Sequence, residues 1–133
     1  MTVSTEDNKA VIRRFIEDGW NKHDPSVINE LVAPDWGGSP ENAERYKKSL
    51  YESLFVALPD SHATIEFQVA EGERVVTRHT ITATHQGEYL GVPPTGKRVT
   101  ITNVCIDTVR DGRIVAGEGE GDYLGLLAQL RAD

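Results

Sequence analysis

The stretch Arg113–Arg131, RIVAGEGEGDYLGLLAQLR, predicts how the chain ends, because a strand-like half runs into a helix-like half. Successive side chains of a strand point to opposite faces, so Glu118, Glu120 and Asp122 share one face and the intervening glycines share the other. Neighbouring carboxylates repel one another, and we expect at least one raised pKa if their face is enclosed. The alternative is a solvated acidic strand.

The acidic residues of this stretch are the first candidates for chemistry. A carboxyl group poised between its charged and neutral forms suits general acid–base catalysis. Asp122 also precedes an apolar periodic run, so it can instead cap the helix that follows. If His79 lies on a neighbouring strand and faces these carboxylates, they would raise its pKa.

Composition narrows the class of protein. The 133 residues suit one domain with a single core. A net charge of −7 argues against nucleic acid and anionic membranes, which both require basic patches. The single cysteine, Cys105, cannot form an internal disulfide. The opening MTVSTEDNKAVIRR lacks a signal-peptide apolar run, and no stretch has the length of a membrane span, so we expect a soluble, cytoplasmic protein.

Three amphipathic helices are predicted in the first sixty residues. The first runs from a cap at Ser4 to Trp20, with apolar residues at helical spacing. The second begins at Asp24 and the third at Ser39, because each of these capping residues precedes a proline. Each helix needs a surface on which to bury its apolar stripe.

Strand-like segments supply that surface. Residues 65–69 alternate in polarity, residues 75–85 and 99–109 are rich in β-branched side chains, and the Asp111-Gly112 turn leads into the last strand. The apolar residues of the third segment fall on both faces, which a bulge would reconcile. The face of the second segment that suits a core, and would place His79 inside, carries Val75, Thr77, His79, Ile81, Ala83 and His85.

This order of elements predicts an α+β fold in which a curved, mostly antiparallel sheet wraps around the three N-terminal helices as a cone. Such a cone leaves a pocket at its wide end, which is the default place for a functional site. We expect residues 1–133 to form this single domain.

Four segments of the chain carry a family resemblance: NKAVIRRFIEDGWNKHDPSVINELVAPD, LPDSHATIEFQVAEGERVVTRHTITATHQGEYLGVPPTGKRV, DGRIV and DYLGLLAQL. They resemble the SnoaL-like polyketide cyclase group, or ester cyclases, of the nuclear transport factor 2-like superfamily. The resemblance implies a general acid–base aspartate at the end of the last strand, a position that falls on Asp122. It also implies an intramolecular aldol ring closure without a metal or organic cofactor.

The chain departs from that group at several positions. Asp35-Trp36-Gly37-Gly38-Ser39 stands where a His-Asp or similar pair is usual. His79 and Glu118 replace a common tryptophan, and Cys105 replaces a frequent aspartate. If His79 and Glu118 face the pocket, its interior differs from that of a typical polyketide cyclase.

We therefore expect a polyketide cyclase-like lyase or isomerase that acts on a small, mostly apolar carbonyl compound. The alternatives are a non-catalytic small-molecule-binding or accessory protein, and an epoxide hydrolase or dehydratase on the same fold. The catalytic candidates are Asp122 as general acid–base, His79 and Glu118. The substrate-binding candidates are Glu120, Phe15, Trp36, Tyr46, Leu50, Tyr51 and Asn103.

The expected partners are a small-molecule substrate and a second copy of the chain, with no nucleic acid or membrane. No cofactor is expected, and no metal, because alternate strand positions converge poorly on one ion. A homodimer is expected through the outer face of the second strand, which is β-branched and lightly charged: Val76, Arg78, Thr80, Thr82 and Thr84.

Overall fold

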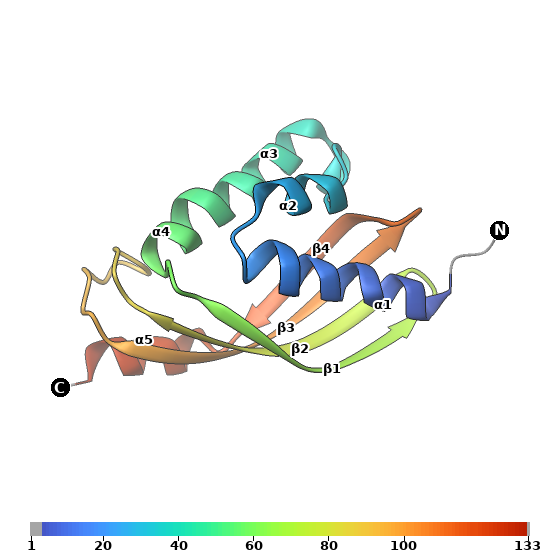
Figure 1. Cartoon of the computed structure of the whole chain (residues 1–133). Helices are drawn as coiled ribbons and strands as arrows, with labels where there is room; N and C mark the ends of the chain where they lie inside the picture. The colour runs from blue at the N-terminus through green and yellow to red at the C-terminus, as the bar shows by residue number, and fades with distance from the viewer. Residues whose placement is uncertain (1–3, 133) are drawn as a thin grey trace.

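The computed structural model describes residues 4–132, apart from the side chain of Ser53. Residues 1–3 and 133 of the predicted domain lie outside the described residues. Three helical stretches precede four strands and one helix follows them, which confirms the predicted order. Figure 1 shows the first three helical stretches on one side of a curved sheet, as expected for the α+β fold.

The helices begin where the sequence predicts. Ser4, Asp24 and Ser39 each accept a hydrogen bond from a backbone amide two or three residues further on, which confirms the three caps. The helical elements are α1 (Thr5–Arg14), η1 (Phe15–Trp20), α2 (Pro25–Leu31), η2 (Trp36–Gly38), α3 (Pro40–Lys48), η3 (Ser49–Leu54) and α4 (Phe55–Ala57). In the part of the chain that the structure describes, no helix combines the length and the apolar composition needed to cross a membrane.

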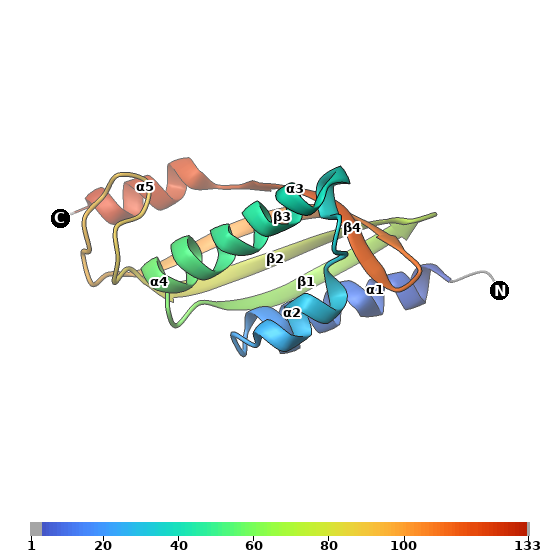
Figure 2. The same cartoon turned by 90° about the horizontal axis from the view of Figure 1, so that it is seen from above.

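The sheet is antiparallel with strand order β1-β2-β3-β4. The elements are β1 (His62–Glu71), β2 (Arg74–Thr84), β3 (Arg98–Arg110) and β4 (Arg113–Gly121), followed by α5 (Tyr123–Arg131). β1 and β4 are its two edges, so the sheet curves beneath the helices without closing into a cone. Figure 2 shows the stretch from α3 to α4 crossing above the strands.

The inner face of β2 is the one predicted from its sequence. Val75, Thr77, His79, Ile81 and Ala83 are all buried beneath the helices. Val75, Ile81 and Ala83 join the apolar stripes of α1, η1 and α2 in one hydrophobic core, whereas Thr77 and His79 are buried polar residues. Their burial is the main favourable contribution to folding.

A bulge in β4 decides the faces of that strand, whereas β3 lacks the bulge that its sequence suggested. Thr108 pairs with Ala116 and Val109 with Ile114, which leaves Val115 as the extra residue. β3 itself is regular, so its odd-numbered residues from 99 to 109 face the helices. Its inner residues are Val99, Ile101, Asn103, Cys105, Asp107 and Val109, and its outward apolar residues are Val104 and Ile106.

The glycines of β4, and not its glutamates, face the helices. Gly117, Gly119 and Gly121 pair with Asp107, Cys105 and Asn103. Glu118 and Glu120 are exposed on the outer face. The sequence correctly separates the acids from the glycines, but the expected enclosed acidic face does not form, because the bulge turns the glycine side inward.

An apolar patch covers the centre of the outer sheet face. It consists of Phe67, Val69, Val76, Val104 and Ile106 from three adjacent strands. Phe67 and Val69 are 51% and 54% exposed. Arg78 and Glu120 flank Val104 in the strand register, so the patch is bordered by one positive and one negative side chain.

We predict that this patch forms a homodimer interface, because a dimer would remove its apolar area from water. Light scattering at micromolar concentration should give twice the chain mass of 14.7 kDa. Val76→Lys should give the monomer mass, whereas Val56→Lys, at an exposed valine on α4, should leave the dimer intact. A monomeric wild-type protein would contradict the prediction.

Candidate functional site

A row of polar side chains runs along the inner face of β3, formed by Asn103, Cys105 and Asp107. Their partners on β4 are glycines, which leave room beside the row. The fit is closest at Gly117, where an added Cβ atom would lie 2.4 Å from Asp107 Oδ1. Glycine at this position therefore admits the Asp107 carboxyl group.

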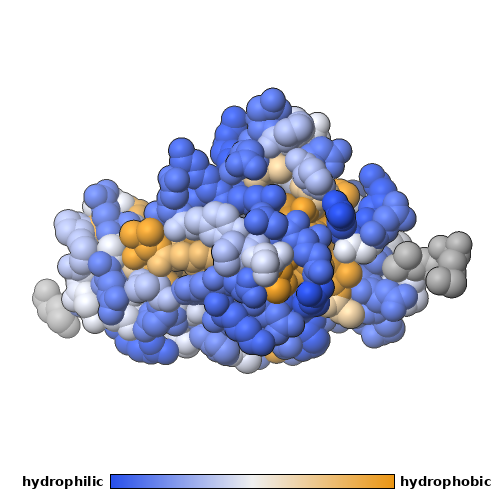
Figure 3. All heavy atoms as spheres, turned by 45° about the horizontal axis from the view of Figure 1, so that its top comes forward, coloured by the Kyte–Doolittle hydropathy of each residue, from blue (hydrophilic) through white to orange (hydrophobic). Residues whose placement is uncertain are grey.

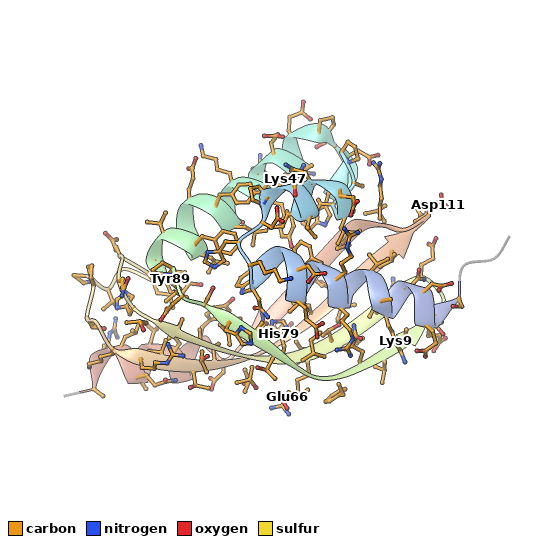
Figure 4. The ribbon with its side chains drawn as sticks, viewed as in Figure 1. Lys9, Lys47, Glu66, His79, Tyr89 and Asp111 are labelled. Carbon is orange, nitrogen blue, oxygen red and sulfur yellow. The ribbon has the colours of Figure 1, made fainter. Side chains whose placement is uncertain are left out.

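His79 on β2 joins one end of this row. Asn103 Nδ2 lies 3.4 Å from His79 Nε2, and an amide that donates there assigns the histidine proton to Nδ1. Figure 4 shows His79 on the helix side of the sheet and Glu66 on the opposite side. The predicted burial of His79 is confirmed, with 5% of the residue exposed.

The pKa of His79 differs from the sequence expectation. Burial lowers this pKa, and the nearby backbone of Thr77 opposes the effect only in part. Asn103, a neutral side chain, stands opposite the ring in the strand register. His79 is therefore a neutral imidazole at pH 7, and the expected increase through facing carboxylates does not occur.

Three buried polar atoms near the inner face have no hydrogen-bond partner among the described residues: His79 Nδ1, Asn103 Oδ1 and Trp36 Nε1. An unsatisfied buried polar atom typically costs about 1–3 kcal/mol. Polar groups of a bound molecule would satisfy such atoms. Figure 3 shows hydrophobic surface, in orange, between the hydrophilic outer faces of the helices, which suits a partly apolar ligand.

Asp107 forms the other end of the row, and Tyr46 lies on α3. Burial raises the pKa of Asp107 to about 7. Burial, and then the negative charge of Asp107, raise the pKa of Tyr46 on α3. The Tyr46 ring stacks on Trp36 with centroids 4.3 Å apart, which fixes its position.

Cys105 lies between the two ends of the row. Its Sγ atom is 3.9 Å from Asn103 Nδ2. Burial, followed by the charge of Asp107, raises the pKa of its thiol to about 12. The thiol is therefore protonated at neutral pH and is no nucleophile there.

Asp122 lies where β4 gives way to α5. Its Oδ1 accepts a hydrogen bond of 2.9 Å from the Gly125 amide, so the helix cap predicted as an alternative role is present. The residue is exposed and follows Gly121, which pairs with Asn103. The Asp122 amide donates to the Thr102 carbonyl at 3.0 Å, so the main chain of Asp122 lies beside β3 next to Asn103, while its carboxyl group contacts the start of α5.

The remaining candidates divide between the core and the surface. Phe15 and Leu50 are buried in the hydrophobic core. Tyr51 is half-buried, and its hydroxyl has no hydrogen-bond partner among the described residues. Glu118 and Glu120 lie on the outer face, away from the polar row.

Sequence reasoning missed Asp107, which has the strongly raised pKa that suits acid–base chemistry. The sequence contained a clue, because Asp107 is separated from Val99 and Ile101 by an even number of residues along the third strand-like segment, which puts all three on the same face. An acidic residue in line with core positions is unusual and could have been singled out.

A surface hollow lies at the turn between β1 and β2, away from the inner polar row. Its lining includes Glu73 and Arg110, which form an exposed ion pair of 2.9 Å. Because these charges already satisfy each other, the hollow offers less chemistry than the inner polar row. We therefore place the candidate site on the inner face, between Asp107 and Asn103.

Comparison with known proteins gives one family. Residues 10–130 match the model of the SnoaL-like polyketide cyclase family. A search of curated proteins gives no match. A proposed SnoaL-like polyketide cyclase from Jannaschia sp. CCS1 superposes with a TM-score of 0.82 at 24% identity, covering 100% of this chain and 99% of that chain.

Two Streptomyces proteins are more similar in sequence. AclR from Streptomyces galilaeus, a proposed hydroxylase, has a TM-score of 0.81 at 33% identity and covers 96% of this chain and 82% of its own. IdmH from Streptomyces antibioticus, a proposed polyketide cyclase, has a TM-score of 0.78 at 31% identity, and the match covers 92% of this chain and 97% of IdmH.

Proposed function

Because the chain belongs to the SnoaL-like polyketide cyclase family, we propose that it is a cyclase-type enzyme that moves protons on a small, mostly apolar carbonyl compound. The reaction would be an aldol-type cyclisation or a related isomerisation. The observation that carries the proposal is the set of unpaired buried polar atoms on the inner face, on His79, Asn103 and Trp36. A carbonyl oxygen would accept from His79 Nδ1 or Trp36 Nε1, a hydroxyl or enol group of the same compound would donate to Asn103 Oδ1, and its apolar body would pack on the surrounding aromatic side chains.

Asp122 is assigned the general acid–base role that the family resemblance implies. Its carboxylate would take a proton from the carbon next to a carbonyl group, which gives an enolate. The enolate carbon would attack a second carbonyl group, forming the carbon–carbon bond, and the protonated Asp122 would return its proton to the new alkoxide. His79 would donate its unpaired Nδ1–H to the enolate oxygen while Asn103 holds Nε2.

A non-catalytic binding protein is the second candidate. Asp122 Oδ1 is already engaged in the helix cap and the residue is exposed, which favours a structural role for this carboxyl group. A binding protein would use the same unpaired atoms of His79 and Asn103 to hold a ligand without changing it.

Product formation tests the proposal. The purified protein should convert at least one member of a panel of linear polyketones, or one metabolite of a cell lysate, to a product of equal mass or one smaller by a water molecule, as mass spectrometry would show. Heat-denatured protein serves as the control. A co-purifying compound that stays unchanged through long incubation, with no product from any source, would favour the binding protein.

A further inference from the structure

We propose that Tyr123 is a movable cover over the Asn103 end of the candidate site, and that its ring turns aside to admit a hydroxyl group of the substrate. The inference rests on the proposed function and extends it. The buried atoms that would receive a ligand, among them Asn103 Oδ1 and His79 Nδ1, have almost no contact with solvent. A substrate therefore reaches them only after a covering group has moved.

The Tyr123 ring lies over Gly121, the last residue of β4. A Cβ atom added to Gly121 would lie 3.2 Å from Cε2 and Cζ of the Tyr123 ring and 3.5 Å from Asn103 Oδ1. The ring and the amide oxygen therefore border the same point in space. Gly121 also pairs with Asn103 in the strand register, so the ring covers this end of the polar row. Glycine at position 121 leaves the room that the ring occupies.

The Asn103 amide is engaged on one side and free on the other. Its Nδ2 atom lies 3.4 Å from His79 Nε2 and 3.9 Å from Cys105 Sγ. Its Oδ1 atom is buried and has no partner among the described residues. The hydroxyl group of an enol or a phenol can donate to this oxygen, whereas a ketone or ether oxygen cannot. The group admitted past Tyr123 is therefore a hydroxyl.

The backbone of β4 offers room for a flat group once the ring has turned away. At Gly119, two residues before Gly121, an added Cβ atom would meet no described atom closer than 3.5 Å, which is ordinary van der Waals contact. Asn103 Oδ1 would lie 3.7 Å from it. A flat group can thus lie over both glycines and place its hydroxyl at Asn103 Oδ1.

The ring of Tyr123 moves more easily than the helix that carries it. Figure 2 shows α5 running on from β4 along the edge of β3. The Asp122 amide donates to the Thr102 carbonyl at 3.0 Å, and the Gln129 side chain makes two hydrogen bonds of 2.8 Å with the backbone of Thr100. Tyr123 itself is 45% exposed and is not part of the described hydrophobic core. Opening therefore requires a side-chain rotation, which is fast for exposed residues, while α5 stays docked.

The probe is 1-naphthol, which is flat and carries a hydroxyl donor, and its methyl ether 1-methoxynaphthalene is the matched compound without the donor. The readout is the side-chain NH₂ signal pair of Asn103 in ¹⁵N–¹H NMR spectra, identified by its loss in Asn103→Leu. At pH 7, 1-naphthol should shift these signals and bind about 3- to 10-fold more tightly than the ether. Asn103→Leu should bind the two compounds with equal affinity, which separates the lost hydrogen bond from the added methyl group.

Tyr123→Ala tests the cover. In the free protein, the Asn103 side-chain hydrogens should exchange with water about 10-fold faster than in the wild type, because the shielding ring is gone. 1-Naphthol should also associate faster and keep its preference over the ether. Leu124→Ala truncates the next residue of α5, which is 84% exposed, and should change neither rate. Thermal melts close to that of the wild type would show that neither variant acts through unfolding.

Equal affinities of the wild type for 1-naphthol and its ether would overturn the proposal, and so would equal exchange rates in Tyr123→Ala and Leu124→Ala. A preference that persists in Asn103→Leu would also contradict it, and if that variant does not fold, the wild-type comparison still decides. These measurements involve no turnover, so their failure leaves the proposed activity to be judged by product formation. Conversely, a lack of product would leave a positive result for Tyr123 intact.

Discussion

Asp122→Asn should lower kcat/KM by about 10²–10⁴-fold while leaving Tm almost unchanged, because asparagine caps helices as well as aspartate but transfers no proton. The asparagine oxygen can still accept the hydrogen bond from the Gly125 amide that starts α5. The substitution thus removes the proposed chemistry and keeps the structural contact. Steady-state rates on the substrate found by product formation, together with thermal melts, would measure both effects.

Two further variants complete the test of Asp122. Asp24→Asn makes the same substitution at the cap of α2, where Asp24 accepts from the Ser26 amide, and should leave the rate unchanged. Asp122→Ala removes both the helix cap and the carboxyl group. It should therefore lower the free energy of unfolding by about 1 kcal/mol and also lower kcat/KM. Full activity in Asp122→Asn would show that Asp122 only caps the helix.

Asp107→Asn should stabilise the protein above pH 8 by up to roughly 4 kcal/mol, the free energy that corresponds to raising a pKa from 3.8 to about 7. The folded protein holds this proton more tightly than the unfolded chain does. The contribution of Asp107 to stability is therefore fully present below pH 3.8 and is lost as pH rises through about 7. Asparagine does not ionise, so the two proteins should converge below pH 4.

Urea unfolding from pH 4 to pH 9 would measure this difference. Glu118→Gln removes one negative charge from the exposed face of the adjacent strand, and serves as the control for the net charge of −7. It should follow the wild-type profile far more closely than Asp107→Asn does. The lowered pKa of His79 acts in the opposite sense, with stability lost as pH falls through its folded pKa. Parallel profiles for Asp107→Asn and the wild type would refute the prediction.

Much of the fold could be predicted from local patterns. The caps at Ser4, Asp24 and Ser39 depend on one side chain and the amide two or three residues later, so the sequence contains the whole interaction. The turn at Asp111-Gly112 needs positive φ at both residues, and the structure has 51° and 77° there. The buried face of β2 likewise follows from strict alternation.

The candidate site was predicted less completely. Trp36, Tyr46, His79 and Asn103 were chosen from the sequence, and the structure places them on the inner side of the molecule. Asp107 was not chosen, because the apolar residues of the third strand fall on both faces and its inner face could not be assigned; the structure shows that β3 is regular and that Asp107 lies on the inner face. The role of Asp122 stays a prediction from family resemblance, with its capping bond now described.

The sequence by itself determined the order of elements, the helix starts and the separation of acids from glycines in β4. Only the tertiary structure decided which of those two sets faces the helices, because a single bulge at Val115 reverses every later side chain of the strand. It also decided the protonation of the site. The pKa of Asp107 is raised by burial, and that burial, with Gly117 of β4 opposite the carboxyl group, arises only when distant segments of the chain come together on folding.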